Sequence, residues 1–176
     1  MKTYNFKLVF RLPDSGPVSA DDVEALFISG CDDALVGMGR AGRIALEFSR
    51  SARTAEIAIR TAIRDVKRAI PEAQLLDATP DLVSITELAE VAGCSRQNLR
   101  KLSIANADSF PAPIYDGGTG IWHLAGVLRW LRDYNGRKVD PLLLEISDAT
   151  MRINIARQAA LINGVKLPKE LSAIVR

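Results

Sequence analysis

The stretch from residue 84 to residue 102 constrains the fold most, because it reads as two short helices separated by a tight turn. Ser84 followed three residues later by Glu87 forms a capping box, which marks the start of a helix. Gly93 lies where the chain must turn sharply, since glycine adopts positive φ freely. Ser95 can cap the second helix. Apolar residues at helical spacing would form the buried faces: Ile85, Leu88, Ala89 and Ala92 in the first helix, and Leu99 and Leu102 in the second.

This arrangement resembles the helix-turn-helix of DNA-binding proteins. With Ile85 as the first position, the constrained positions carry the residue types expected there: a small Ala89, the turn glycine Gly93, and packing residues Leu99 and Leu102. A small residue is needed at Ala89 because the second helix crosses close above it. The resemblance implies that the second helix enters the major groove of double-stranded DNA. The alternative is a helical hairpin that has no contact with DNA.

The residues that follow extend the resemblance. A proline-rich segment over 110–115 cannot be helical, because proline fixes φ and removes a donor. The glycine-rich stretch 116–120 predicts a hairpin turn, and 121–122 a returning strand. A third amphipathic helix follows, with Leu124, Val127, Leu128 and Leu131 on one face. In this order the elements resemble the small winged helix-turn-helix domains of the excisionase/AlpA group, relatives of the MerR regulators, and we place this domain at residues 82–136.

The resemblance and the side-chain chemistry together predict the residues that contact DNA. At the start of the second helix Arg96, Gln97 and Asn98 are candidates to read bases, because arginine can bridge guanine and an amide can bridge adenine. Arg100 and Lys101 lie a turn further along, where phosphate contacts are expected. The remaining candidates are Ser95 as the helix cap, Thr86 near the start of the first helix, and Thr119 in the hairpin.

The charge of this domain bears on how it would bind DNA. Residues 81–136 contain five Lys and Arg against six Asp and Glu, and no Lys or Arg lies between Tyr115 and Trp122. Phosphate contacts from the hairpin would therefore have to come from Thr119 and from backbone N–H groups. Because basic side chains supply much of the affinity for DNA, one copy should bind weakly. A homodimer would raise the affinity by engaging two half-sites.

The N-terminal residues predict a separate α+β domain over residues 1–79. Its expected elements alternate as strand, helix, strand, strand, helix, strand, which matches a ferredoxin-like βαββαβ arrangement. RNA binding by this domain is not expected, since Phe48 is in phase with Ile44 and Leu46 and should lie in the core. The expected strands are 4–10, 34–38, 44–48 and 73–78; the first helix has Val23, Leu26 and Phe27 on its apolar face, and the second covers 54–70 with a basic outer side.

The C-terminal segment, residues 139–176, predicts a long helix after Pro141. Apolar or small residues recur with alternating gaps of four and three, which is the a/d rhythm of a coiled-coil seam: Leu142, Ile146, Ala149, Ile153, Ala156 and Ala160. We expect this seam to form a homodimer. The alternative is that the helix packs back on its own domain. The helix is expected to end at 163–164, before a short last helix over 167–171.

Several classes of protein are not expected. No run of eighteen apolar residues and no signal peptide is present, so a cytoplasmic protein without a membrane segment is predicted. No cluster of His, Cys and carboxylates has metal-ligand spacing, and no catalytic or cofactor-binding motif occurs, so neither a metal, nor a cofactor, nor an enzyme is predicted.

The fold class expected is α+β, with a ferredoxin-like domain, a winged helix-turn-helix domain and a C-terminal helix. The expected function is sequence-specific DNA binding by a bacterial or phage transcription regulator; a protein-interaction adaptor and an excisionase-like protein that bends DNA remain as alternatives.

Overall fold

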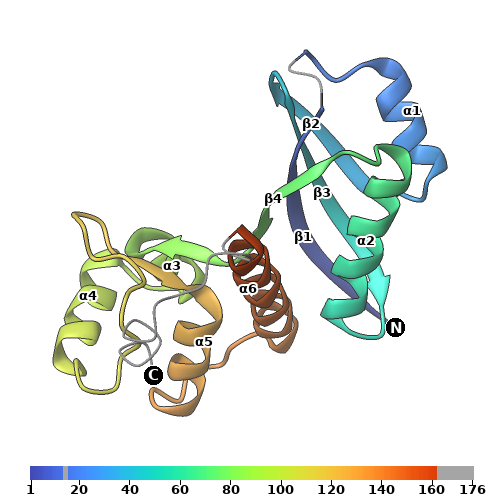
Figure 1. Cartoon of the computed structure of the whole chain (residues 1–176). Helices are drawn as coiled ribbons and strands as arrows, with labels where there is room; N and C mark the ends of the chain where they lie inside the picture. Colours follow the sequence, from blue (N-terminus) through green and yellow to red (C-terminus); the bar gives the residue numbers. More distant parts are fainter. Residues whose placement is uncertain (14–15, 162–176) are drawn as a thin grey trace, which may run out of the picture.

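The computed structural model describes residues 1–13 and 16–161, and the chain is a mixed α and β protein (Figure 1). The predicted end of the last helix at 163–164 and the short helix over 167–171 lie outside the described residues. The N-terminal part contains β1 (Lys2–Arg11), α1 (Ala20–Ile28), β2 (Ala34–Arg40), β3 (Arg43–Ala52), α2 (Ala55–Ala69) and β4 (Gln74–Thr79). The rest contains β5 (Leu82–Ser84), α3 (Ile85–Val91), α4 (Arg96–Ala105), β6 (Ile121–His123), α5 (Leu124–Asp133) and α6 (Pro141–Leu161).

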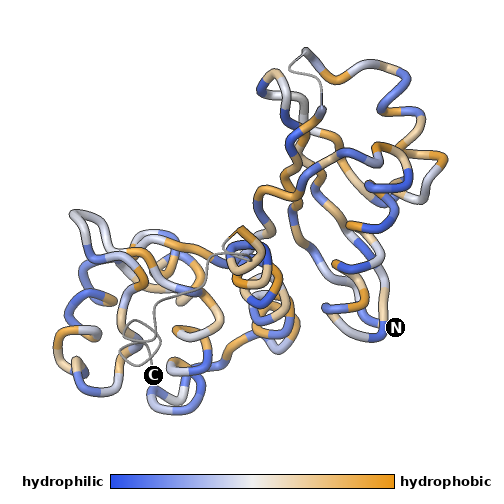
Figure 2. The backbone as a smooth tube through the Cα atoms, viewed as in Figure 1, coloured by the Kyte–Doolittle hydropathy of each residue, from blue (hydrophilic) through white to orange (hydrophobic). Residues whose placement is uncertain are grey.

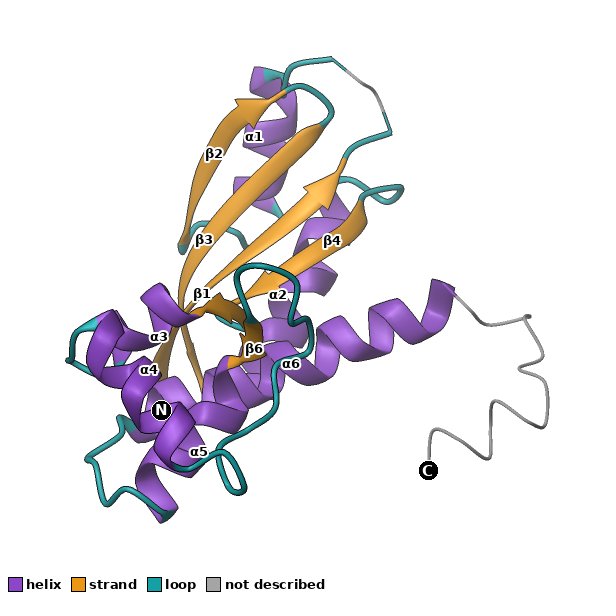
Figure 3. Cartoon of the chain, turned by 90° about the vertical axis from the view of Figure 1, so that its left-hand side faces the viewer, coloured by secondary structure: helices purple, strands orange, loops and turns teal. Residues whose placement is uncertain are grey.

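The first four strands form one antiparallel sheet in the order β2-β3-β1-β4. Both α1 and α2 lie on one face of this sheet (Figures 1 and 3). Strand residues alternate in burial, as the period of two predicts, and the Phe6 and Phe48 rings stack across β1 and β3 with centroids 5.2 Å apart. Phe48 is buried, as the sequence predicted. The face of the sheet that carries the apolar side chains is therefore the face covered by the two helices.

The first helix differs from the prediction in one respect. Leu26 is fully buried, but the side chain of Phe27 is 65% exposed. The prediction that Phe27 faces inward is wrong. Neighbouring residues on a helix point about 100° apart, and a helix of nine residues that packs on one side has room for only a narrow apolar stripe. Phe27 therefore remains at the surface.

Within the C-terminal part, β5 and β6 form a second antiparallel sheet. Helices α3, α4 and α5 share a separate core around Leu88, Leu99 and Leu124. An aromatic cluster ties the proline-rich segment to α5, because the Phe110 and Trp130 rings meet edge to face with centroids 5.0 Å apart. The indole nitrogen of Trp130 donates to the hydroxyl of Ser109 at 3.2 Å. These contacts fix the segment between α4 and the hairpin.

Helix α6 packs between the two parts of the chain (Figure 1). Ile146 and Ala149 are buried in the N-terminal core, while Leu143 contacts both cores. Leu142 and Ile153 also pack partly buried against this core, so four residues of the predicted dimer seam contact the chain itself. The intramolecular packing given above as the alternative is the one observed. Ala156 and Ala160, further along the helix, are exposed. A homodimer stays a prediction, but the stripe through Ile146 and Ala149 is already occupied.

A buried polar network holds α6 at the junction between the two parts. The side chain of Asn154 accepts from the N–H of Ala78 at 3.0 Å and donates to the carbonyl of Ala78 at 2.8 Å. It also donates to the carboxylate of Asp81, which lies 2.6 Å from Nδ1 of His123 at the start of α5. Thr150 donates to the carbonyl of Pro80 at 2.5 Å. Because buried polar groups are stable only when paired, this network specifies one arrangement of the linker over 78–81.

Candidate nucleic-acid interface

The first helix of the candidate site, α3, begins as the sequence predicted. The hydroxyl of Ser84 accepts from the N–H of Glu87 at 3.3 Å, and the N–H of Ser84 donates to the carboxylate of Glu87 at 2.7 Å. The hydroxyl of Ser84 also donates to this carboxylate at 2.7 Å, and the bonds from the backbone N–H and from the hydroxyl together hold the pKa of Glu87 below its usual range. Ile85, Leu88 and Ala89 are buried. The capping box therefore fixes where α3 starts and which face it turns inward.

The turn between α3 and α4 has the geometry that its glycine predicts. Gly93 has a φ of +62°, in the left-handed region that favours glycine. The N–H of Cys94 donates to the carbonyl of Ala89 at 2.9 Å, which closes the end of α3. The guanidinium of Arg137 donates to the carbonyl of Ala92 at 2.6 Å. A residue between α5 and α6 thus also secures the turn.

Helix α4 presents one buried and one open side. Ser95 caps it by accepting from the N–H of Asn98 at 3.1 Å. Leu99 is fully buried and Leu102 packs against the same core, which seats α4 on α3 above the buried Ala89. The open side consists of the predicted polar residues, all exposed: Arg96, Gln97, Asn98, Arg100 and Lys101. Figure 2 shows hydrophilic residues in blue along this helix, in the part of the chain farthest from the four-stranded sheet.

The basic side chains on α4 are not paired with other groups of the described chain. Within residues 1–13 and 16–161, the side chains of Arg96, Arg100 and Lys101 form no ion pair and no intramolecular hydrogen bond. Arg50, by contrast, is buried and bonded to Asp33 and to Asp65. Among the described residues, the cations of α4 thus have no counter-charge bonded to them, and their side chains are exposed.

The hairpin after α4 is short and its turn is compact. The N–H of Ile114 donates to the carbonyl of Ile121 at 2.7 Å, and the N–H of Ile121 donates to the carbonyl of Tyr115 at 2.9 Å. A side chain at Gly117 would collide with the ring of Tyr115, because a Cβ there would lie 2.1 Å from the phenol oxygen. Thr119, the predicted contact in the hairpin, is exposed. The ring of Tyr115 therefore lies over the backbone of Gly117, and an added side chain there would require the exposed tyrosine to move.

The structure brings most of the predicted residues to one end of the molecule. Helix α4 and the hairpin both lie on the side of the C-terminal part that is turned away from the four-stranded sheet (Figure 1). Thr86 is exposed on the first turn of α3. The hydroxyl of Ser95 is used as a helix cap, as predicted, so Ser95 serves α4 mainly as a structural residue.

Three features of this region were not predicted from the sequence. Strand β5, only three residues long, pairs with β6 and places the hairpin beside the start of α3. Arg137 secures the helical turn from a distant position in the chain. The ring of Tyr115 covers Gly117. Of the three, only the packing of Tyr115 over Gly117 involves residues close enough in the sequence to be predicted from it, because the tyrosine lies two positions before a pair of glycines.

Comparison of the chain with protein-family models, with curated proteins and with solved structures finds no match. In the part of the chain that the structure describes, no group of three or more His, Cys, Asp or Glu side chains is arranged to hold a metal ion. No described helix combines the length and the apolar character needed to cross a bilayer.

Proposed function

We propose that the chain is a sequence-specific DNA-binding protein that reads the major groove with α4 and regulates transcription. The observation that carries this proposal is the open side of α4, where Arg96, Arg100 and Lys101 are exposed and unpaired among the described residues. Guanidinium and ammonium groups on a helix are suited to phosphates and guanine edges. The buried Leu99 side holds the helix so that this face points away from the protein.

The arrangement of elements supports the same proposal. A three-residue strand, two helices at a glycine turn, a hairpin and a third helix form the order of a winged helix-turn-helix domain. We further propose that the N-terminal part is ferredoxin-like, since its strand order β2-β3-β1-β4 and its two helices on one face agree with that arrangement. A fold alone does not define a function, so the proposal depends on the side chains of α4.

The base-reading roles follow from position on the helix. Arg96, Gln97 and Asn98 occupy the first turn of α4, the part that enters deepest when a helix is inserted end-first into a groove. Arg100 and Lys101 lie one turn further and meet the phosphates that border the groove. Each well-formed bidentate base contact is worth about 1–3 kcal/mol of discrimination.

The decisive experiment is selection of bound sequences from a random DNA pool by the full chain, followed by binding measurements on the enriched sequence. The proposal expects one enriched motif, and a change in the preferred base at one or two positions when Arg96 or Gln97 is replaced by Ala. Arg60→Ala is a matched control, because Arg60 is exposed on α2, far from α4 in the sequence, and forms an ion pair with Glu56. An unenriched pool, together with no retardation of DNA at micromolar protein in low salt, would refute it.

A second candidate function is that of a protein-interaction adaptor with a winged helix and no DNA contact. Three large apolar side chains near the candidate interface are exposed, Ile104 at the end of α4 and Ile114 and Tyr115 in the hairpin. The lack of Lys and Arg between Tyr115 and Trp122 agrees with this alternative. It predicts that the Arg96→Ala variant behaves as the unaltered protein in every DNA assay.

A further inference from the structure

The outer edge of β2 is unpaired within the described chain. This strand lies at one end of the sheet order and pairs only with β3 (Figure 3). The N–H of Ser49 donates to the carbonyl of Asp33, so odd-numbered residues of this segment bond to β3. Hydrogen bonds of an antiparallel strand alternate sides, and the N–H and C=O of Val36 and the C=O of Ala34 therefore point away from the sheet.

The opposite edge of the sheet, formed by β4, is partly covered by α6. At β4, the N–H and the C=O of Ala78 are both bonded to the side chain of Asn154 from α6. That edge is thus covered where α6 reaches it. Proteins normally cover or interrupt the edges of their sheets, because open edges pair with other strands. The contrast makes β2 the edge that is available to another strand.

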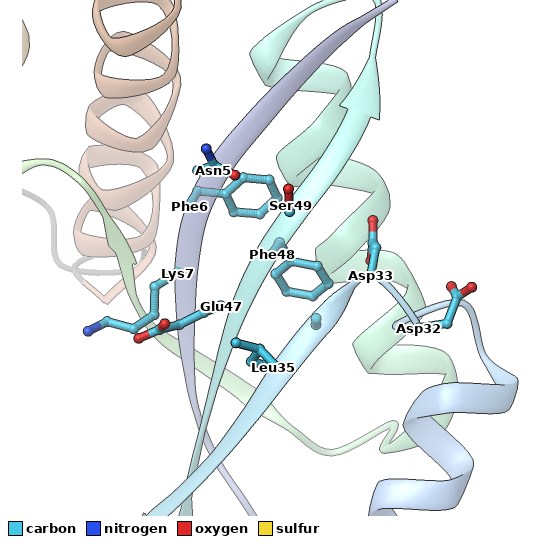
Figure 4. A pocket seen from close by; sticks show the side chains of 10 residues that line it. Asn5, Phe6, Lys7, Asp32, Asp33, Leu35, Glu47, Phe48 and Ser49 are labelled. Carbon is cyan, nitrogen blue, oxygen red and sulfur yellow. The ribbon is translucent and has the colours of Figure 1, made fainter.

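A large apolar side chain lies on this open-edge strand. Leu35 in β2 is 75% exposed. Figure 4 shows Leu35 on the same side of the sheet as Lys7 and Glu47, the side that carries no α1 or α2. In Figure 3, α1 lies behind β2, on the other side. The side of β2 that no helix covers therefore exposes a large apolar side chain, which a partner strand could cover.

The charges along β2 identify the partner. Asp32, just before the strand, is exposed, while Arg40 at its end and Arg43 after the turn are exposed as well. The side chains of these three residues form no ion pair with any other described residue. The strand is acidic at one end and basic at the other. An antiparallel copy of the same strand would place each acidic end beside a basic end.

We propose that β2 pairs antiparallel with β2 of a second copy of this chain, about a two-fold axis at Val36, so that two four-stranded sheets become one. In this register Val36 exchanges both backbone hydrogen bonds with its symmetry mate. Leu35 then lies across from Gly37 of the other copy, where no side chain obstructs it. The Asp32 end of each strand faces the Arg40 end of the other. This interface is independent of the DNA-binding proposal and does not use the stripe of α6 through Ile146 and Ala149, which the chain itself covers.

The test is a measurement of mass against concentration for the full chain, by sedimentation equilibrium, with charge-reversal variants. Asp32→Arg and Arg40→Asp should each raise the dimer dissociation constant about tenfold or more, because the two-fold axis repeats every unfavourable contact. The double variant Asp32→Arg/Arg40→Asp should return it to near the original value. Glu72→Arg is the matched control, since Glu72 is exposed in the turn before β4 and should leave association unchanged.

A second variant tests the apolar part of the same interface. Leu35→Asn should weaken association at least tenfold while the circular dichroism spectrum stays the same, because Leu35 is mostly exposed in the single chain. A chain that remains monomeric up to about a hundred micromolar, as expected if an extended peptide of another protein occupies the edge, would overturn the proposal. It would be overturned equally by a dimer whose dissociation constant is unaffected by Asp32→Arg and Leu35→Asn, or by a double variant that fails to restore association.

Discussion

The salt dependence of DNA binding offers the sharpest test of the role of Lys101. Lys101 is exposed on α4 and forms no ion pair among the described residues, so its ammonium is free to contact a phosphate. Each phosphate that a protein neutralises releases condensed counterions, and the slope of log affinity against log salt is about −0.9 for each such contact. Replacing Lys101 by Ala should therefore make the slope shallower, reducing its magnitude by about 0.9 for each copy bound.

The expected magnitudes can be derived from the two cations assigned to phosphates, Arg100 and Lys101. Between 50 and 200 mM salt, two contacts reduce the affinity of one copy about twelvefold, whereas one contact reduces it only about 3.5-fold. For two copies bound to adjacent half-sites, the corresponding losses are about 150-fold and about twelvefold. Lys101→Ala should leave the preferred sequence unchanged, because a phosphate contact carries no sequence information.

The assay is fluorescence anisotropy of a labelled duplex carrying the selected sequence, titrated at four or more salt concentrations. Lys67→Ala is the control, since Lys67 is exposed on the basic outer side of α2 and outside the candidate interface. If Lys101→Ala leaves the slope unchanged, Lys101 does not contact a phosphate. If Lys67→Ala reduces the magnitude of the slope instead, the DNA lies along α2 and the assignment to α4 is refuted.

Three further predictions concern the framework of the site. Leu99→Ala should lower the free energy of unfolding by about 3 kcal/mol, because a fully buried leucine leaves a cavity, and denaturant unfolding would measure it. Asn154→Ala should cost about 3 kcal/mol in the same assay, since three buried hydrogen bonds at the junction lose their partner. The lowered pKa of Glu87 means that its contribution to stability is complete at neutral pH and is lost as the pH falls through the pKa of the folded state. Glu87→Gln should therefore reduce the loss of stability in acid, which thermal unfolding at several pH values would detect; equal acid dependence of both proteins would contradict it.

Local rules predicted most of the secondary structure. The alternation from Tyr4 to Phe10 places β1, and the capping pair Ser84 and Glu87 places α3, because each signal depends only on residues a few positions apart. The exposure of Arg96 and the burial of Leu99 follow from helical periodicity in the same way. These predictions needed no information about distant parts of the chain.

The remaining features depend on contacts between residues far apart in the sequence. A stripe such as Ile146 and Ala149 shows that a helix buries one side, but it does not show whether a second chain or the chain's own core covers it. Strand β5 has three residues and becomes a strand only by pairing with β6. Asn154 looks like an ordinary polar helix residue until Ala78, 76 positions away, is placed beside it.

The position of α6 has a consequence for how two copies would bind DNA. Helix α6 packs against the N-terminal core through Ile146 and against the C-terminal core through Leu144. Its residues Asn154 and Thr150 also bond to the linker between these two cores. The polar groups of this linker are paired, so α4 holds a defined orientation relative to the β2 edge. If two chains pair through β2, the distance between their α4 helices is fixed as well. The selected DNA should then contain two half-sites at a single spacing, whereas a flexible linker would allow several spacings to be enriched.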